Sequence, residues 1–155
     1  MLDRIDRAIL GHLARDARMS NKDLARDVGL SQSACLERVR RLADQKTLRG
    51  AHADVDPRAL GIEVQALVAV QLKQHTRKAV ARFEAKAWAL PQVVTMYHTT
   101  GRNDYIAHVV AQDMDHLRDF TLDALNALPE VARIDTSLVF KDFNKHGWPD
   151  LTEEE

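Results

Sequence analysis

Apolar residues near the start of the chain recur at the spacing of a helix. Ile5 and Ile9 stand four residues apart behind an acidic start, and this pattern predicts a helix over about 3–15. Ser20 then stands as an N-cap three residues before an acid, and Gly29 ends a short apolar pattern at a position typical of a C-terminal glycine. The pattern therefore predicts a second helix of only two turns.

A third helix is predicted from the cap Ser31 to about Asp44, after a short turn that contains glycine. On a 100° wheel, its apolar residues fall on one side and its short or basic residues on the other. The inward set is Cys35, Leu36, Val39, Leu42 and Ala43, and the outward set is Ser33, Ala34, Glu37, Arg40 and Arg41. A helix-turn-helix of this kind is typical of proteins that read the major groove of DNA.

This helix supplies most of the candidate DNA contacts. Gln32, Ser33 and Arg40 are expected to read bases, while Arg38 and Arg41 are expected to bind phosphate. The N-terminus of the second helix is a further phosphate anchor, because its N–H groups are free. The full predicted set is Ser20, Asn21, Lys22, Ser31, Gln32, Ser33, Glu37, Arg38, Arg40, Arg41 and Arg49. The alternative left open is that the arginines form an ordinary solvated helix face.

The residues after the third helix predict a wing and then a connector. Residues 46–55 resemble two short strands around Gly50, with Arg49 near the tip, which completes a winged helix-turn-helix DNA-binding domain over 1–55. Residues 56–63 interrupt both periodicities and are expected to link this domain to a second one.

From Val64 the apolar positions alternate, and the order strand, helix, strand occurs twice. Strands are expected at 64–72, 93–100, 105–111 and 131–140, with helices near 79–88 and 113–128. Two βαβ halves predict a ferredoxin-like βαββαβ domain over 64–141, followed by a tail over 142–155. The chain is thus predicted to be α+β, and the open face of its sheet is expected to form a dimer.

The turn between the two central strands is the candidate effector site. Gly101 supplies a positive φ, and Thr99 and Thr100 supply hydroxyl groups beside backbone N–H groups. These donors would hold the carboxylate of a zwitterion, and Asp104 would hold its ammonium group. The alternative is a capped hairpin in which Asp104 bonds its own turn.

Charge divides the chain of 155 residues in two. Residues 1–50 hold 11 Lys and Arg against 7 Asp and Glu, a balance of +4, and residues 51–155 hold 11 against 16, a balance of −5. A basic first part is expected to meet a polyanion. A single cysteine excludes an intramolecular disulfide or a thiolate zinc cluster, and we expect neither metal nor cofactor.

No apolar run approaches the roughly 20 residues that span a bilayer, and the start lacks the pattern of a signal peptide. A cytoplasmic, nucleoid-associated protein without a membrane partner is therefore expected.

Several motifs together resemble the Lrp/AsnC, or feast/famine, family of transcription regulators. In the first half they are residues 2–7, 20–25, 28–31 and 35–42, and in the second half Thr100-Gly101 with Asp104-Tyr105 and Asp113-Met114. The resemblance implies a homodimer formed through the βαββαβ domains, often assembled into an octamer. It also implies an amino acid or related small effector bound between dimers, and double-stranded DNA as the partner.

The same resemblance implies which residues bind the effector. By position they are Thr99, Thr100, Gly101, Asp104, Met114, Thr136, Ser137, Leu138 and Val139. Two departures from the family pattern change the expectation. Ser33-Ala34 stands where the family commonly has Thr-Pro, so a different operator is expected, and Ser137 is smaller than a leucine responder would have, which argues against leucine.

Two other functions are compatible with this two-domain pattern. Some haem-precursor decarboxylases share this two-domain architecture and rely on histidines, and His98 and His108 lie on the central strands here. The histidines show no i, i+4 ligand pairing with a carboxylate, so we expect no enzyme activity. An architectural DNA-binding protein without an effector is the third reading, and DNA binding insensitive to every amino acid would favour it.

Overall fold

The computed structural model describes residues 2–144 and 148–151, which form two compact units. The first unit holds residues 2–54 with the described residues after Asp142, and the second is Val55–Asp142. Each unit has its own hydrophobic core. Within the described ranges, no helix combines the length and the apolar composition that crossing a membrane requires.

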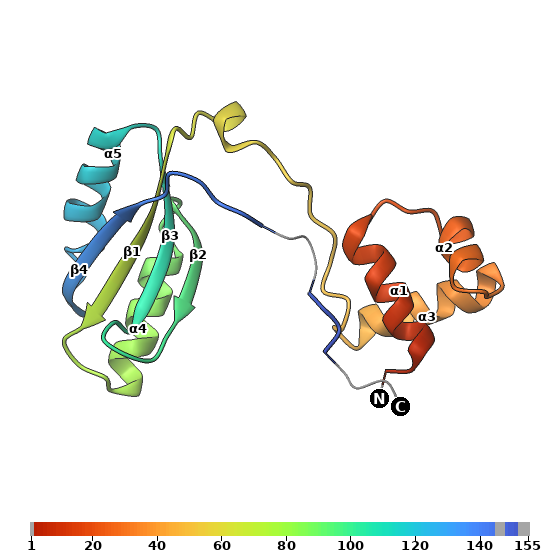
Figure 1. Ribbon diagram of the computed structural model, residues 1–155. Helices are drawn as coiled ribbons and strands as arrows, with labels where there is room; N and C mark the ends of the chain where they lie inside the picture. Colours follow the sequence, from red (N-terminus) through yellow and green to blue (C-terminus); the bar gives the residue numbers. More distant parts are fainter. Residues whose placement is uncertain (1, 145–147, 152–155) are drawn as a thin grey trace. The chain divides into compact units, whose positions relative to one another are not determined.

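The first unit is a bundle of three helices, as predicted (Figure 1). They are α1 (Arg4–Arg15), α2 (Asn21–Asp27) and α3 (Gln32–Asp44). Each helix begins after a residue whose side chain accepts from a backbone N–H of the first turn, and these residues are Asp3, Ser20 and Ser31. Buried Ile9, Leu24, Cys35 and Leu42 form the centre of the bundle.

The predicted wing is wrong, because the described residues 46–55 contain no strand. The residues expected to begin the wing instead form the C-terminal cap of α3. Lys46 takes a left-handed conformation with φ of 56°, and the amides of Thr47 and Leu48 both donate to the carbonyl of Leu42, each at 3.0 Å. An isolated two-stranded hairpin is also marginal without a third strand or a packed face. The fold of this unit is therefore a helix-turn-helix without a wing in the described chain.

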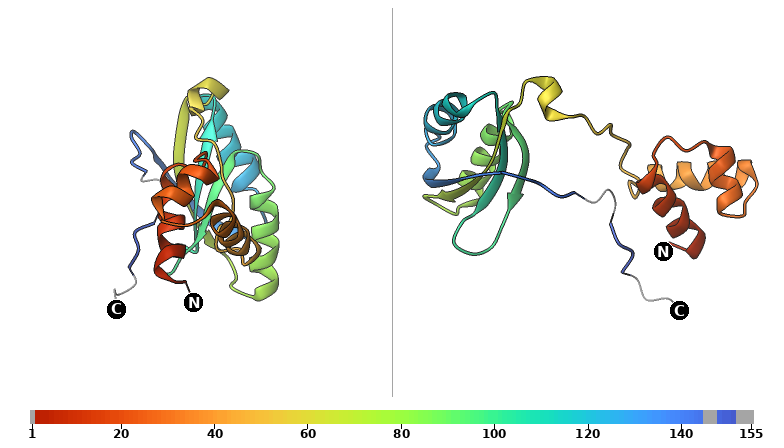
Figure 2. Two further views of the ribbon diagram at one scale, coloured as in Figure 1. Left: turned by 90° about the vertical axis from the view of Figure 1, so that its right-hand side faces the viewer. Right: turned by 45° about the horizontal axis from the view of Figure 1, so that its top comes forward.

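The second unit is a four-stranded antiparallel sheet with both helices on one face (Figures 1 and 2). The strand order is β2-β3-β1-β4. The elements are β1 (Val64–Leu72), α4 (Arg77–Trp88), β2 (Val93–His98), β3 (Tyr105–Ala111), α5 (Met114–Asp119), a π-helical continuation (Phe120–Leu125) and β4 (Val131–Leu138). This order and topology confirm the predicted βαββαβ domain.

The two halves of the sheet unit repeat each other at the corner that leads from helix to strand. The amide of Val93 donates to Leu90, and the amide of Val131 donates to Leu128, both at 3.0 Å. The alternating apolar residues of β1 point to the helices, and Val68 and Val70 are fully buried. On the opposite face Leu67 is 42% exposed and Tyr97 57% exposed. The open face of the sheet therefore carries exposed apolar side chains together with polar ones.

Candidate nucleic-acid interface and effector site

The exposed face of α3 is wider than the helix wheel predicts, and it is polar at its start. Cys35 and Leu42 are fully buried, whereas Leu36 is 38% exposed and Ala43 is also exposed. These two inward predictions are wrong, because a three-helix bundle this small covers only a thin stripe of its third helix. Leu36 instead lies in an exposed row, four residues after Gln32 and four before Arg40.

Several predicted DNA contacts also hold the helix-turn-helix together. Ser20 Oγ caps α2 through the amide of Asp23 at 3.1 Å, and Ser31 Oγ caps α3 through the amide of Ala34 at 3.2 Å. The Asn21 amide group donates to the carbonyl of Gln32 at 2.8 Å and so ties α2 to the first turn of α3. These contacts fix the geometry of the turn and leave Lys22, Gln32, Glu37 and Arg40 exposed to solvent.

Two of the three arginines on α3 pair with α1. Asp6, whose side chain is only 3% exposed, accepts from Arg38 Nη1 at 2.9 Å and from Arg41 Nη2 at 2.7 Å. Arg38 also reaches Asp3 at 2.6 Å. This hydrogen bond comes first among the causes that lower the pKa of the Asp3 carboxyl, and the same ion pairs raise the pKa of the Arg38 guanidinium.

The ion-pair network changes what can be expected of these arginines. Their charges are compensated by Asp3 and Asp6, so Arg38 and Arg41 position α3 against α1. Phosphate binding by Arg38 and Arg41 stays a prediction. It would require each guanidinium to donate to a phosphate and to the carboxylates of α1 at the same time. Arg40 has no such partner among the described residues and keeps its charge exposed. Arg49 is exposed in the segment where the wing was expected.

A shallow cleft beside the start of α3 adds a residue that sequence reasoning missed. It is lined by Lys22, Ala25, Arg26, Leu30, Ser31 and Gln32. Arg26 lies on α2 and pairs with Asp23 at 3.0 Å and Asp27 at 3.1 Å. Its position four residues after Lys22 places the two cations on one face of α2, and this spacing is the signal in the sequence that points to it. The cleft brings two cations to the end of α3 that is expected to enter the groove.

The turn between β2 and β3 is closed by its own residues, while Asp104 bonds elsewhere. Gly101 has the predicted positive φ, 110°. The amide of Thr99 donates to the carbonyl of Asp104 at 2.8 Å, and its hydroxyl donates to the carbonyl of Asn103 at 3.0 Å. The Asp104 carboxylate accepts from the amide of Leu72 at 2.7 Å and contacts His75 Nε2 at 2.8 Å. It therefore anchors the turn to the end of β1.

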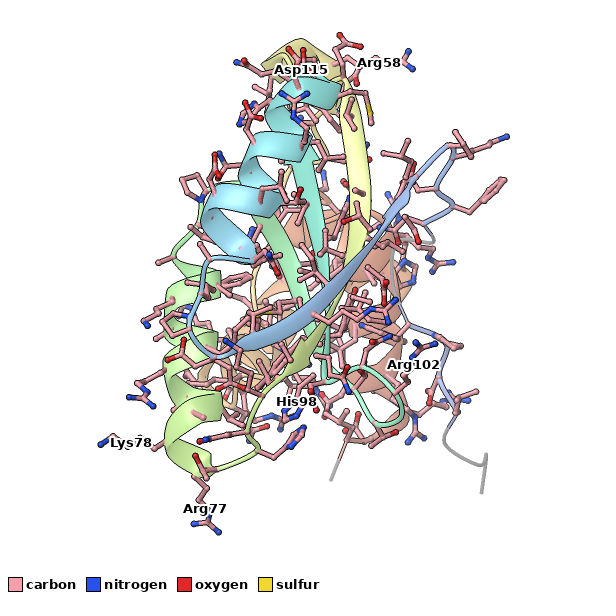
Figure 3. The ribbon with its side chains drawn as sticks, turned by 90° about the vertical axis from the view of Figure 1, so that its left-hand side faces the viewer. Arg58, Arg77, Lys78, His98, Arg102 and Asp115 are labelled. Atoms are coloured by element: carbon pink, nitrogen blue, oxygen red, sulfur yellow. The ribbon has the colours of Figure 1, made fainter. Side chains whose placement is uncertain are left out.

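The predicted effector residues form two groups, one at the turn and one that runs from the level of Val68, midway along β1, to the other end of the sheet. The turn holds Thr99, Thr100, Gly101 and Asp104, and the amide of Asp104 donates to Val70. Leu138 instead pairs with Ala66, next to Thr136, Ser137 and Val139, and Met114 follows the strand end at Ala111, opposite Val64. Figure 3 shows Arg102 of the turn and Asp115, the neighbour of Met114, at the two ends. At roughly 3.3 Å per residue, the ends are about 15–20 Å apart.

The histidines that the enzyme reading needs are on different faces. His98 stacks on Tyr105 with ring centroids 4.5 Å apart on the helix side of the sheet. His108 Nε2 contacts Gln65 Oε1 at 2.8 Å on the open side. No group of three or more His, Cys, Asp or Glu suited to a metal occurs among the residues that the structure describes.

Comparison with known proteins places both units in one family. A family model described as the AsnC-type helix-turn-helix domain matches residues 2–43, and one described as the Lrp/AsnC ligand binding domain matches residues 65–149. The chain is 43% identical over 140 residues to the transcriptional regulator AldR of Mycolicibacterium smegmatis, covering 90% of this chain and 82% of that protein. It is 40% identical over 139 residues to the transcriptional regulator AzlB of Bacillus subtilis, covering 90% and 88%.

Solved structures agree with these relatives. A transcriptional regulator of Neisseria meningitidis in complex with L-methionine has a TM-score of 0.87 and 29% identity, covering 94% of each chain. AsnC of Escherichia coli has a TM-score of 0.84 and 26% identity, covering 96% of this chain and 98% of that one.

A helix-turn-helix unit followed by an antiparallel α+β ligand-binding domain defines a class of transcriptional regulators. Within that class the chain belongs to the Lrp/AsnC family.

Proposed function

We propose that this regulator binds double-stranded DNA with sequence specificity through the exposed row of α3, and that an amino acid bound between copies of the chain controls this binding. The observation that carries the proposal is the row Gln32, Leu36, Arg40 on a helix whose own arginines fasten it to α1. A recognition helix must be held firmly against its own domain and must leave one face exposed to DNA, and α3 meets both conditions.

Each exposed residue in the row has a preferred base. An arginine bonds the O6 and N7 of guanine, a glutamine bonds adenine, and an apolar side chain contacts the methyl group of thymine. Arg40, Gln32 and Leu36 are therefore the base-reading residues, with Glu37 able to accept from a cytosine amine. Lys22 lies beside the start of α3 and supplies a phosphate contact, whereas Arg26 beside it shares its donors with Asp23 and Asp27.

The separation of the two effector groups supports a site shared between copies. A single amino acid is shorter than the sheet, so the turn of one chain and the Met114 and Ser137 end of the same chain cannot enclose it together. Packing the turn of one copy against the far end of another would do so. The L-methionine complex of the N. meningitidis regulator supports an amino acid as the ligand class.

The DNA reading is tested with an operator selected from random duplexes by the purified protein. Arg40→Ala is expected to weaken operator binding by about 1–3 kcal/mol and to relax preference at one base pair. Arg18→Ala is the matched control, since it removes an exposed arginine from the loop before α2. An equal loss on selected and random DNA would reduce Arg40 to a phosphate contact.

The effector reading is tested by thermal-shift screening with the twenty amino acids. A ligand at a hundred times its dissociation constant stabilises the folded state by roughly 2.7 kcal/mol. For the amino acid that shifts melting, Asp104→Asn is expected to abolish the shift while operator binding in its absence is kept. If none of the twenty changes melting or operator affinity, the architectural alternative is favoured.

A further inference from the structure

A hollow lies between α4 and the corner that leads into β4, and none of its residues belongs to the proposed DNA or effector sites. It has a volume of about 280 Å³ and is open to solvent. Its polar lining consists of Lys73, Arg82, Lys86 and Glu130 with one glutamine. Three cations and one carboxylate give the lining a net charge of +2, in a part of the chain whose overall balance is −5.

Glu130 is the buried centre of this hollow. Its side chain is 6% exposed, and its oxygens lie 3.4 Å from Arg82 Nε and 3.4 Å from Lys86 Nζ. Its backbone carbonyl accepts from the amide of Lys73 at 2.9 Å. Burial alone would raise the pKa of Glu130, but a backbone hydrogen bond and the charges of Lys86 and Arg82 outweigh burial and lower it. Glu130 is therefore ionised and holds both cations at the hollow.

The cations are not saturated by this one carboxylate. Tight charge-assisted hydrogen bonds measure about 2.7–2.9 Å, so contacts at 3.4 Å leave both donors able to take a stronger acceptor. The contact between Arg82 and Glu130 joins Nε to Oε1. A guanidinium group carries two further nitrogens that can donate to a ligand. Arg82 and Lys86 remain 55% and 45% exposed.

We propose that this hollow binds a phosphate group. A phosphate carries up to two negative charges and three strong acceptor oxygens, which match the net charge of +2 and the fork of Arg82. The volume lies just under the usual range for small-molecule pockets, roughly 300–1,000 Å³, and suits a phosphate with a small organic group. This match favours the terminal phosphate of a phosphorylated small molecule. A phosphodiester of the DNA backbone, with one charge and two free oxygens, is the other source that the experiments distinguish.

Calorimetric titration of the full chain with inorganic pyrophosphate tests the site. The double variant Arg82→Gln/Lys86→Gln is expected to weaken pyrophosphate binding at least about tenfold, since it removes the donors. The matched control is Arg77→Gln/Lys78→Gln, which removes the same charge from the first turn of α4. Figure 3 shows both control residues at the end of the helix, and neither lines the hollow. The control is expected to stay within about twofold of the wild type.

DNA titrations with the same two variants identify the source of the phosphate. If the DNA backbone occupies the hollow, Arg82→Gln/Lys86→Gln lowers the slope of log affinity against log salt by about 0.9 for each lost contact, and pyrophosphate competes with DNA. If a small molecule occupies it, the variant binds DNA like the wild type.

The proposal is overturned if both double variants weaken pyrophosphate binding equally, or if the wild type shows no saturable binding. Arg82→Gln/Lys86→Gln leaves Glu130 unpaired and could fail to fold for that reason. In that case the triple variant Arg82→Gln/Lys86→Gln/Glu130→Gln, which also removes the carboxylate, takes the place of the double variant in the comparison. The pyrophosphate titrations contain neither DNA nor an amino acid, so a negative result there overturns the phosphate site and leaves the proposed function untouched.

Discussion

At the scale of single residues, Asp6 has the most consequential position in the helix-turn-helix. Its N–H and side chain belong to the capping box of α1, and its buried carboxylate accepts from both Arg38 and Arg41. One side chain thus starts α1 and orients α3. Sequence patterns reveal the first role, because an acid in the first turn is a familiar signal, but the second depends on a tertiary contact more than 30 residues away.

Asp6→Asn is expected to lower the free energy of unfolding by about 2–3 kcal/mol, because two guanidinium groups lose a buried anion. Urea unfolding followed by circular dichroism measures this change. Asp44→Asn, at the exposed end of α3, is the control and is expected to stay within about 0.5 kcal/mol of the wild type. Equal stability of the two variants would mean that water can solvate Arg38 and Arg41 in place of the Asp6 carboxylate without a loss of stability.

Tyr105 predicts how stability changes at high pH. It is 1% exposed, and its hydroxyl donates to Glu84 at 2.8 Å. Burial first, and then the hydrogen bond and charge of Glu84, raise the pKa of Tyr105 above its ordinary value near 10. The unfolded chain therefore loses this proton first, and the stability that the neutral hydroxyl contributes below pH 10 is lost as the pH rises further.

Between pH 9 and pH 11, the free energy of unfolding of the wild type is expected to fall by about 1 kcal/mol more than that of Tyr105→Phe. Unfolding measured at several alkaline pH values checks this difference. Tyr97→Phe, at a tyrosine that is 57% exposed, is expected to show the same pH dependence as the wild type. If the free energy of unfolding of Tyr105→Phe fell with pH as that of the wild type does, the raised pKa of Tyr105 would be contradicted.

At the scale of elements, the sequence predicts best where one local signal decides the outcome. Caps at Ser20 and Ser31 and the alternation of β1 place their elements within a residue or two. The wing is predicted wrongly because a glycine and an alternating pattern do not show that the same residues form the C-terminal cap of the preceding helix. The site is predicted least well, since the partners of Arg38, Arg41 and Asp104 all come from distant segments.

The docking of α3 on the bundle predicts the reactivity of Cys35. The thiol is fully buried, and burial raises its pKa, so the reactive thiolate is scarce in the folded protein. Alkylation by iodoacetamide is expected to be at least about 100-fold slower in the native protein than in urea. Asp6→Asn is expected to speed native labelling, because it loosens α3 from α1. Labelling at the unfolded rate would show that α3 is not docked in solution.

At the scale of the whole molecule, the uncovered sheet face and the helix-turn-helix make one joint prediction. Leu67 and Tyr97 lie on this face with the half-buried Ile106 and Val110, and a monomer would leave all four in partial contact with water. A homodimer formed through this face would also bring two recognition helices to one duplex, as two half-sites require. Dimer formation and tight operator binding are therefore expected to fail together.

Leu67→Glu is expected to shift the protein to monomer in analytical ultracentrifugation, since it replaces an exposed apolar side chain of this face with a charge that dimer formation would bury. Operator affinity is expected to fall at least about tenfold, because each recognition helix then binds its half-site alone. Leu122→Glu makes the same change at a leucine that is 54% exposed on the π-helical continuation of α5, which covers the other face of the sheet. That variant is expected to keep both the dimer and the affinity, so a repulsion between the added charge and DNA cannot account for the loss. A Leu67→Glu protein that remains dimeric would place the dimer contact on another surface and leave this sheet face for a different partner.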